Sequence, residues 1–390
     1  MRGAEVYTAV ADVAAGFAGE RAERQQRTSL DPVDFERLAE AGLQGTGLPV
    51  ERGGLWSSVH ESTRPICELY RTLAGGDPAV ALVAAMHPSV LAFWLATPAV
   101  DDDPPGVAAA WTAQRDWVFD TVARDGAWWG TITSEPGSGG DVTKSRTKAV
   151  HGDRGWHISG AKHFGSGTGI SSFMLTTAVA EGDEGADWFF VPMGGRPLDG
   201  TAGVTLTAPW DGHGMAATQS HALTFDACPA ERFAWPGHLD DVIAAAAPFF
   251  STLFTAVVLG IVDTAIALAR EQLVAKGGAA ALRPFEQVEW ARADLDAWTA
   301  VQAYEGALRA IESMPVTESR LVALRAKTVV AELAESCLLR LCRVLGGGTF
   351  SRRSPFGNWF EDVRALGFLR PPWGLAYDGL IAGTTSSTNT

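Results

Sequence analysis

The chain has 390 residues, of which 46% are apolar and 19% are charged, and its formal net charge is −14. This composition predicts a soluble globular protein large enough for two or three domains, and the acidic balance argues against nucleic acid or an anionic membrane as the main partner. The four cysteines form no C-x-x-C pair, so we expect neither a bound metal nor a redox dithiol, and their scarcity favours a cytoplasmic location.

The predicted elements fall into three regions. Residues 1–125 carry apolar side chains at helical spacing and predict an N-terminal helical domain, in which Asp77 caps a helix that starts at Pro78. From 126 to 235 the apolar runs are short, β-branched or aromatic, and Gly, Asp and Pro separate them, which predicts a central antiparallel β domain. Residues 236–390 return to long Ala- and Leu-rich helices and predict a C-terminal helical bundle. The predicted fold class is α+β.

One apolar segment needs a choice between two environments. Residues 243–262 carry no charge and are nearly long enough to span a bilayer. The segment contains Pro248 and several hydroxyl residues, and it continues directly into a charged helical sequence. We therefore expect a buried core helix and no membrane span.

A glycine-rich loop, TSEPGSGGD (residues 133–141), opens the β region. It lacks the sequences of a Walker A loop and of a Rossmann fingerprint, so by itself it is either a plain turn or a ligand loop. Thr131 and Thr133 are two residues apart, which places both hydroxyls on one face of a strand. About thirty residues later, AKHFGSGTG offers Phe164 to pack on a flat ring and Ser166 to hydrogen-bond beside it.

These segments, in this order, resemble the acyl-CoA dehydrogenase superfamily of flavoproteins. The resemblance rests on GLPVERGGL, on TSEPGSGGD, on HGMAATQSHALTFDACPAE and on LGGGTF followed by EDVR. It implies an N-terminal helical domain, a central β domain and a C-terminal four-helix bundle, assembled as a homodimer or homotetramer. It also implies FAD, with FMN as the alternative, bound between the β domain and the bundle.

The resemblance assigns site residues position by position. Lys276 stands where the family has an arginine that holds pyrophosphate, Gln287 matches a flavin-contacting glutamine, and Gly346 and Gly347 match a loop that reaches the flavin of a neighbouring subunit. Gly140 replaces a serine of the family signature. The implied flavin-binding set is Thr131, Thr133, Ser134, Gly139, Gly140, Phe164, Ser166, Lys276, Gln287, Gly346 and Gly347.

The catalytic base of the dehydrogenases has no counterpart in this sequence. That base is a glutamate eight residues after the Asp of an "Arg-Asp" pair; the pair is Glu361-Asp362 here, and the count ends on Arg370. The alternative base position lies in the helix at 242–262, which contains no acid. Asp378 is the remaining substitute. Because an arginine cannot accept a proton at working pH, we expect Arg370 either to bind an acidic substrate or a carrier phosphate, or to form a surface salt bridge.

This absence favours the flavin-dependent monooxygenase and N-oxygenase branch of the superfamily, in which reduced flavin forms a C4a-hydroperoxide. In that branch His87 and Ser166 are the predicted catalytic residues, with His87 hydrogen-bonded to the peroxide, and a flavin reductase is a candidate partner. The alternative for His87 is a histidine that packs in the protein or caps a helix. Two alternatives stay open: an FAD-dependent acyl-CoA or acyl-carrier thioester dehydrogenase, and a non-catalytic flavin-binding subunit of a heteromeric dehydrogenase. The substrate is expected to be a small molecule or an acyl or carrier-bound compound.

Overall fold

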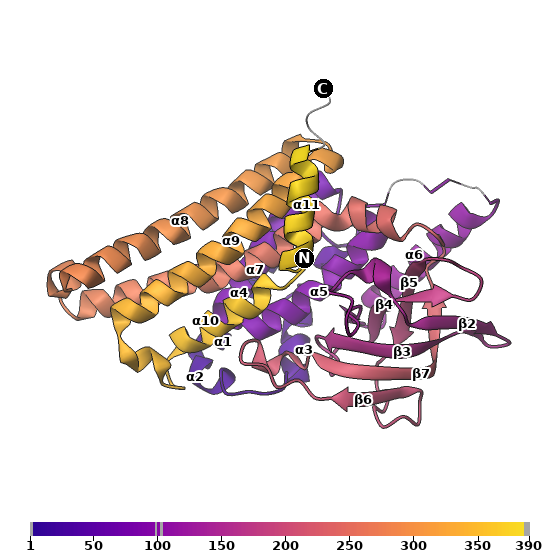
Figure 1. The fold of residues 1–390 in the computed structure, drawn as a ribbon, viewed down its shortest axis with the longest axis horizontal. Helices are drawn as coiled ribbons and strands as arrows, with labels where there is room; N and C mark the ends of the chain where they lie inside the picture. Colours follow the sequence, from indigo (N-terminus) through magenta and orange to yellow (C-terminus); the bar gives the residue numbers. More distant parts are fainter. Residues whose placement is uncertain (1–2, 98–99, 102–103, 386–390) are drawn as a thin grey trace.

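A computed structural model describes residues 3–97, 100–101 and 104–385 of the chain. The predicted order of helices, strands and helices is confirmed (Figure 1). The first helical region consists of α1 (Gly3–Gly19), α2 (Arg21–Arg24), α3 (Pro32–Glu40), η1 (Gln44–Gly47), η2 (Val50–Arg52), α4 (Val59–Gly76), α5 (Pro78–Leu95) and α6 (Val107–Ala123). Asp77 accepts hydrogen bonds from the backbone N–H groups of Ala79 and Val80, so it caps α5 as expected.

The central region is a β barrel. It comprises β1 (Trp129–Thr131), η3 (Val142–Lys144), β2 (Lys148–Gly152), β3 (Gly155–Gly165), β4 (Phe173–Ala180), β5 (Ala186–Pro192), β6 (Val204–Ala208), η4 (Ala216–Thr218) and β7 (His221–Arg232). The strands pair in the order β1-β4-β2-β3-β7-β5, a β4–β5 pairing closes the sheet, and β6 pairs with β7. Most pairs are antiparallel, but β1 and β2 each run parallel to β4. The sheet is therefore mixed, because β4 returns beside strands to which no hairpin joins it.

The last region is a bundle with a short C-terminal extension. Its elements are α7 (Leu239–Ala275), η5 (Gly278–Ala281), α8 (Pro284–Ser313), α9 (Val316–Leu345), η6 (Gly347–Phe350), α10 (Pro355–Gly367) and α11 (Trp373–Thr385). Figure 1 shows α7, α8 and α9 side by side, with the β barrel at the opposite side of the molecule. The segment that joins α10 to α11 lies between the bundle and the barrel.

Two helices in the described part of the chain, α5 and α7, are long and apolar enough to cross a membrane. In each, 83% of the most apolar window is buried inside the protein. α5 packs against both α7 and β1, so these helices form the shared core between the helical regions and the barrel. The predicted core helix over 243–262 is confirmed, and burial of this apolar surface is the main contribution that the segment makes to stability.

Candidate functional site

A cleft runs along the seam where the β barrel meets α5, α7 and the segment between α10 and α11. It consists of two adjoining cavities, a first cavity of about 690 Å³ and a second cavity of about 330 Å³. The residues that line both are Met86, Thr131, Gly140, Arg370 and Pro372. We call residues 131–147 the strand wall of the cleft and residues 361–373 its helical wall.

The first cavity collects many of the predicted flavin-binding residues. Its lining includes Thr131, Ser134, Gly139, Gly140, Phe164 and Ser166. Thr133 joins the set indirectly, because its hydroxyl oxygen accepts a hydrogen bond of 2.5 Å from Arg370 Nη2. Segments that are distant in the sequence therefore converge at this cavity, and their contact with a flavin stays a prediction.

Phe164 has the geometry of a ligand platform. Its side chain is 59% exposed although it stands inside the cavity, and its ring meets Trp210 edge to face at 6.0 Å between centroids. The backbone of Phe164 has φ = +59°, and two further non-glycine residues near the cavity, Met215 and Gln219, also have positive φ. Strained backbone of this kind gathers at functional sites, because the surrounding structure must enforce it.

Hydroxyl groups line the floor behind Phe164. Ser166 Oγ lies 2.8 Å from Ser220 Oγ, and Ser220 Oγ lies 2.7 Å from Thr218 Oγ1. Each hydroxyl can donate or accept, so this chain can adapt to the ring nitrogens and carbonyls of a flat heterocycle. A cavity of this volume with an exposed aromatic ring above a hydroxyl floor fits a flavin ring.

A buried ion pair supports the strand wall from beneath. Lys162 Nζ donates to Glu135 Oε1 at 2.7 Å, and neither side chain is more than 3% exposed. Glu135 also accepts from the hydroxyls of Ser145 and Thr147. Burial alone would raise the pKa of Glu135, but the hydrogen bonds from Lys162, Ser145 and Thr147 outweigh it and hold the pKa at about 2. The loop 133–147 is thereby tied to the barrel by a charge that stays ionised.

The glycine that departs from the family signature has a local explanation. Gly140 has φ = +84°, and a Cβ atom at this position would lie 2.8 Å from Pro372 Cγ. The strand wall and the helical wall touch here, so only a residue without a side chain fits both the backbone conformation and the contact.

Arg370 stands at the boundary of the two cavities. Its guanidinium donates to Thr133 and, among the described residues, forms no ion pair with a carboxylate. Burial lowers the pKa of Arg370 to about 10, so the group remains cationic. The turn that carries it is held by Lys327, whose ammonium donates to the carbonyls of Gly367 and Pro371 at 2.8 Å each. Arg370 is therefore a pre-positioned cation in the cleft.

The structure does not place His87 in the cleft. The side chain is fully buried, and burial lowers its pKa to about 3. Nδ1 accepts a hydrogen bond from the Trp129 backbone N–H at 3.0 Å, so Nε2 carries the hydrogen and donates to the Gln44 carbonyl at 3.0 Å. Both ring nitrogens are occupied. The predicted contact of His87 with a flavin-bound oxygen is therefore wrong for this geometry, and the residue joins α5 to β1 and η1 instead.

Four other predicted residues lie outside both cavities. Lys276 follows the end of α7, Gln287 is near the start of α8, and Gly346 and Gly347 follow α9. Arg343 near the end of α9 pairs with Glu289 near the start of α8, which places these segments at one end of the bundle (Figure 1). The single chain does not bring them to the cleft, so their contact with a flavin stays a prediction for an assembly. Asp378, the substitute base, is exposed on α11 and lines neither cavity.

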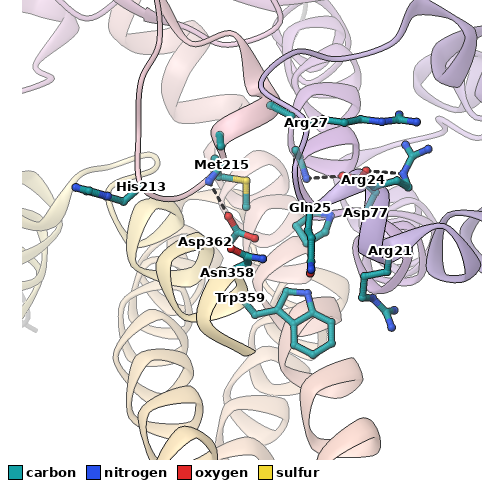
Figure 2. Close-up of a pocket in the computed structure, with 15 residues that line it drawn as sticks. Arg21, Arg24, Gln25, Arg27, Asp77, His213, Met215, Asn358, Trp359 and Asp362 are labelled. Atoms are coloured by element: carbon teal, nitrogen blue, oxygen red, sulfur yellow. Dashed lines mark hydrogen bonds and ion pairs between the residues drawn. The ribbon is translucent and has the colours of Figure 1, made fainter. Parts of the chain in front are cut away.

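Beside the cleft, a small cavity of about 70 Å³ lies where α2, the start of α5, η4 and α10 meet. Figure 2 shows Asp362 of the helical wall pointing toward Met215, whose backbone N–H donates to the carboxylate at 2.6 Å. Burial raises the pKa of Asp362 to about 7, and the negative charges of Asp77 and Glu361 add to this, while the Met215 bond opposes it. The bond joins α10 to the barrel loop that borders the first cavity.

Sequence reasoning missed the two lysines that hold the walls, although each had a signal. Lys162 shares the inward face of β3 with Ile158, four residues earlier, and Lys327 shares the buried stripe of α9 with Ala323 and Val330. A lysine at a core position of a periodic pattern predicts a buried charge with a dedicated set of partners.

Comparison with known proteins finds nitrososynthases, a probable FMNH2-dependent monooxygenase and a putative acyl-CoA dehydrogenase among the relatives. The family "Acyl-CoA dehydrogenase, middle domain" matches residues 130–228. The amino sugar nitrososynthase DnmZ of Streptomyces peucetius is 24% identical (90% of this chain, 85% of DnmZ), and the L-evernosamine nitrososynthase of a Micromonospora species is 28% identical (95% and 87%). The probable FMNH2-dependent monooxygenase SfnC of Pseudomonas putida is 27% identical (67% and 60%).

Solved structures share the whole fold. The nitrososynthase of Micromonospora carbonacea var. africana superposes with a TM-score of 0.78 at 23% identity, covering 98% of this chain and 96% of that one. The complex of TdsC from Paenibacillus sp. A11-2, a dibenzothiophene monooxygenase, with FMN and indole has a TM-score of 0.76 at 20% identity, covering 98% and 97%. The resemblance to the acyl-CoA dehydrogenase superfamily is confirmed.

Proposed function

We propose that this chain, a protein of the acyl-CoA dehydrogenase superfamily, is a flavin-dependent monooxygenase or N-oxygenase acting on a small molecule. The observation that carries the proposal is the charge at the boundary of the two cavities, where the Arg370 guanidinium stands and no carboxylate among the described lining residues is free. The names of the relatives, nitrososynthases and an FMNH2-dependent monooxygenase, support the same class of reaction.

Removal of a substrate proton in the dehydrogenase reaction requires a carboxylate that is free to accept it. Among the described residues that line the cavities, the carboxylates are Glu135 and Asp141. Glu135 is committed to Lys162. Asp141 accepts from the backbone N–H and the hydroxyl of Thr143 and pairs with Lys144 at 3.1 Å. Neither is available as a base, which argues against the dehydrogenase alternative.

The first cavity is the proposed flavin site. Phe164 would pack on the ring, the hydroxyls of Ser166 and Ser220 would hydrogen-bond to its polar edge, and the strand wall would approach it through Ser134 and Gly139. Reduced flavin would supply the electrons that activate dioxygen, by way of the C4a-hydroperoxide. FMN is at least as good a candidate as FAD, since the TdsC complex contains FMN. A flavin reductase is the expected partner.

An oligomer is part of the proposal. The outer face of α8 presents Phe285, Val288, Leu295 and Trp298, each at least half exposed. Their spacing forms one stripe along the helix, and an apolar stripe of this length favours a second copy of the chain. Sedimentation velocity with a Trp298→Glu variant tests this, because a wild-type monomer would contradict it and a dissociated variant would support it.

The function is tested by mixing the protein with reduced FMN and air-saturated buffer in a stopped-flow spectrometer. We expect a transient absorbance band typical of a flavin C4a–oxygen adduct. The adduct should live longer on the protein than the adduct that free reduced FMN forms in the same buffer. Anaerobic mixing of the oxidised flavoprotein with octanoyl-CoA is the opposing experiment. Rapid bleaching by octanoyl-CoA would establish the dehydrogenase, and absence of both signals would favour the non-catalytic subunit.

A further inference from the structure

We infer that the second cavity binds a compact aromatic carboxylic acid, with its carboxylate on Arg370 and its ring among the aromatic side chains at the other side of the cavity. This inference rests on the proposed function, because it names the class of substrate that would face the flavin. It is carried by the lining of the cavity, by the charges around Arg370 and by the rigidity of the turn that presents the guanidinium.

Most of the second cavity is apolar, and its rings are arranged together. Phe93 lies 5.0 Å from Trp188 and 6.1 Å from Phe250 between centroids, and all three side chains line the cavity. Such a cluster offers both ring faces and ring edges to a planar ligand. The remaining lining is largely aliphatic: Met86, Val90, Val142, Leu175, Ile243, Ala247, Leu324 and Leu375. A planar apolar ring fits this surface.

The same lining disfavours a polyhydroxylated substrate. The described lining carries four hydroxyl groups, those of Ser89, Thr131, Thr143 and Ser251. Three of them already have protein partners: Ser89 donates to the Ala85 carbonyl, Thr131 to the Met86 sulfur, and Thr143 to Asp141. A sugar ring buried here would leave several of its hydroxyls without partners, at a cost of about 1–3 kcal/mol for each. The cavity therefore differs in chemistry from what the amino sugars in the relatives' names would require.

The charges around the cavity favour an anion. Among the described residues, Arg370 hydrogen-bonds only to the neutral Thr133 hydroxyl, Arg320 stands exposed at the rim, and the single acid of the lining, Asp141, is neutralised by Lys144. A partly buried guanidinium without a counterion is unfavourable, and a carboxylate is the group that matches its paired donors. The two bonds from Lys327 to the Gly367 and Pro371 carbonyls hold the turn on both sides of Arg370, so little ordering is needed when the anion binds.

The test measures equilibrium binding to the oxidised, FMN-loaded protein, which needs no oxygen chemistry. Indole-3-acetate and indole-3-acetamide form a matched pair of equal size, as do benzoate and benzamide. Isothermal titration calorimetry with wild type should show the acid of at least one pair binding at least about tenfold more tightly than its amide, the scale of one charge-assisted hydrogen-bond pair. The Arg370→Gln variant should lose this preference, and Arg370→Lys should keep part of it.

Controls separate this inference from its alternatives. Arg325→Gln removes an exposed positive charge on α9 outside both cavities and should leave the preference unchanged. Equal binding of acid and amide in both pairs, or no binding of either, overturns the inference. So does loss of FMN affinity in Arg370→Gln with the preference intact, since Arg370 would then serve the flavin. Binding of ADP that depends on Arg370, with no Arg370-dependent binding of the acids, would assign Arg370 to a carrier phosphate instead. Acid binding without an oxygen adduct in the stopped-flow experiment would reject the oxygenase and keep this site.

Discussion

The two walls of the cleft hold buried charges in opposite ways. In the strand wall, Glu135 receives hydrogen bonds from Lys162, Ser145 and Thr147, and its pKa falls to about 2. In the helical wall, Asp362 receives one backbone hydrogen bond, lies near other carboxylates, and has a pKa raised to about 7. The pKa values of two carboxyl groups beside the same cleft therefore shift in opposite directions, because Glu135 has a dedicated cation and Asp362 has none among the described residues.

The buried lysines of the two walls, Lys162 and Lys327, also differ in whether they have a partner of opposite charge. Burial lowers the pKa of both Lys162 and Lys327 to about 8, but Lys162 has a carboxylate partner that opposes the shift. Lys327 has two carbonyls and the face of Trp373 at 5.1 Å. The strand wall is thus held by an ion pair, that of Lys162 and Glu135. The helical wall is held by the Lys327 ammonium, which bonds to neutral carbonyl groups. We expect the Glu135 carboxylate of the strand wall to stay ionised across the physiological pH range, and the Asp362 carboxyl of the helical wall to titrate within it.

The largest expected effect comes from breaking the pair in the strand wall. Glu135→Gln leaves the Lys162 ammonium fully buried without a counterion, which should lower the free energy of unfolding by about 3–5 kcal/mol in urea denaturation. Glu184→Gln, at an exposed loop position of the same barrel, is the matched control. The double variant Glu135→Gln with Lys162→Met should recover part of the loss. A change below about 1 kcal/mol would show that the pair does not hold the wall.

The pH response should reside in the helical wall. Because the folded-state pKa of Asp362 is raised from its ordinary value, the folded protein keeps a proton that the unfolded chain releases, so its stabilising contribution is present at low pH and is lost as pH rises toward 7. Asp362→Asn keeps an acceptor for the Met215 N–H and removes the titration. Between pH 4 and 7, the free energy of unfolding of Asp362→Asn should increase relative to that of wild type by about 1.4 kcal/mol for each unit by which the pH rises.

The control for this profile is Asp211→Asn, an exposed acid in the loop that precedes Met215. Denaturation curves for this variant should run parallel to those of wild type across the same pH range. If Asp362→Asn is also parallel to wild type, Asp362 titrates normally and the comparison of the two carboxylates fails.

Phe164, the aromatic platform of the first cavity, should matter for cofactor affinity rather than for stability. Phe164→Ala removes an exposed ring, so unfolding should change little, while FMN and FAD should bind more weakly by about 1–3 kcal/mol. Fluorescence titration with both flavins measures this. Tyr7→Ala, an exposed aromatic on α1 outside the cleft, is the control. Unchanged titration of the Phe164 variant would remove the residue from the flavin site.

The smallest expected effect is at Lys327. Lys327→Met removes two hydrogen bonds but also the cost of burying an ammonium, so the free energy of unfolding should change by no more than about 1–2 kcal/mol. The turn carrying Arg370 should loosen, and the preference for indole-3-acetate over its amide should fall a few-fold while FMN affinity is kept. Lys148→Met, an exposed lysine on β2, should leave the preference unchanged. An unaltered preference in Lys327→Met would show that the turn carrying Arg370 keeps its position without the hydrogen bonds from Lys327.

The sequence determined what depends on neighbours along the chain. Apolar spacing located the helices and strands, Asp77 and Pro78 marked the start of α5, and the loop of residues 133–141 with Phe164 identified one side of the cleft. Counting along the chain from Asp362 to the position of the dehydrogenase base reached Arg370, so the absence of an acid there is evident from the sequence alone. These features follow from local rules of periodicity, capping and turn chemistry.

Only the tertiary structure decided how those residues are used. Arg370 meets Thr133 across 237 positions, and Lys327 meets the Gly367 carbonyl across 40. His87 was assigned to the cleft from its resemblance to a histidine of the monooxygenase branch, but whether an imidazole faces a cavity or bonds to Trp129 and Gln44 depends on which segments pack around it. Hydrogen-bond partners and desolvation are set by groups brought together in space, so no pattern along the chain could separate the carboxylate that stays ionised from the one that takes up a proton.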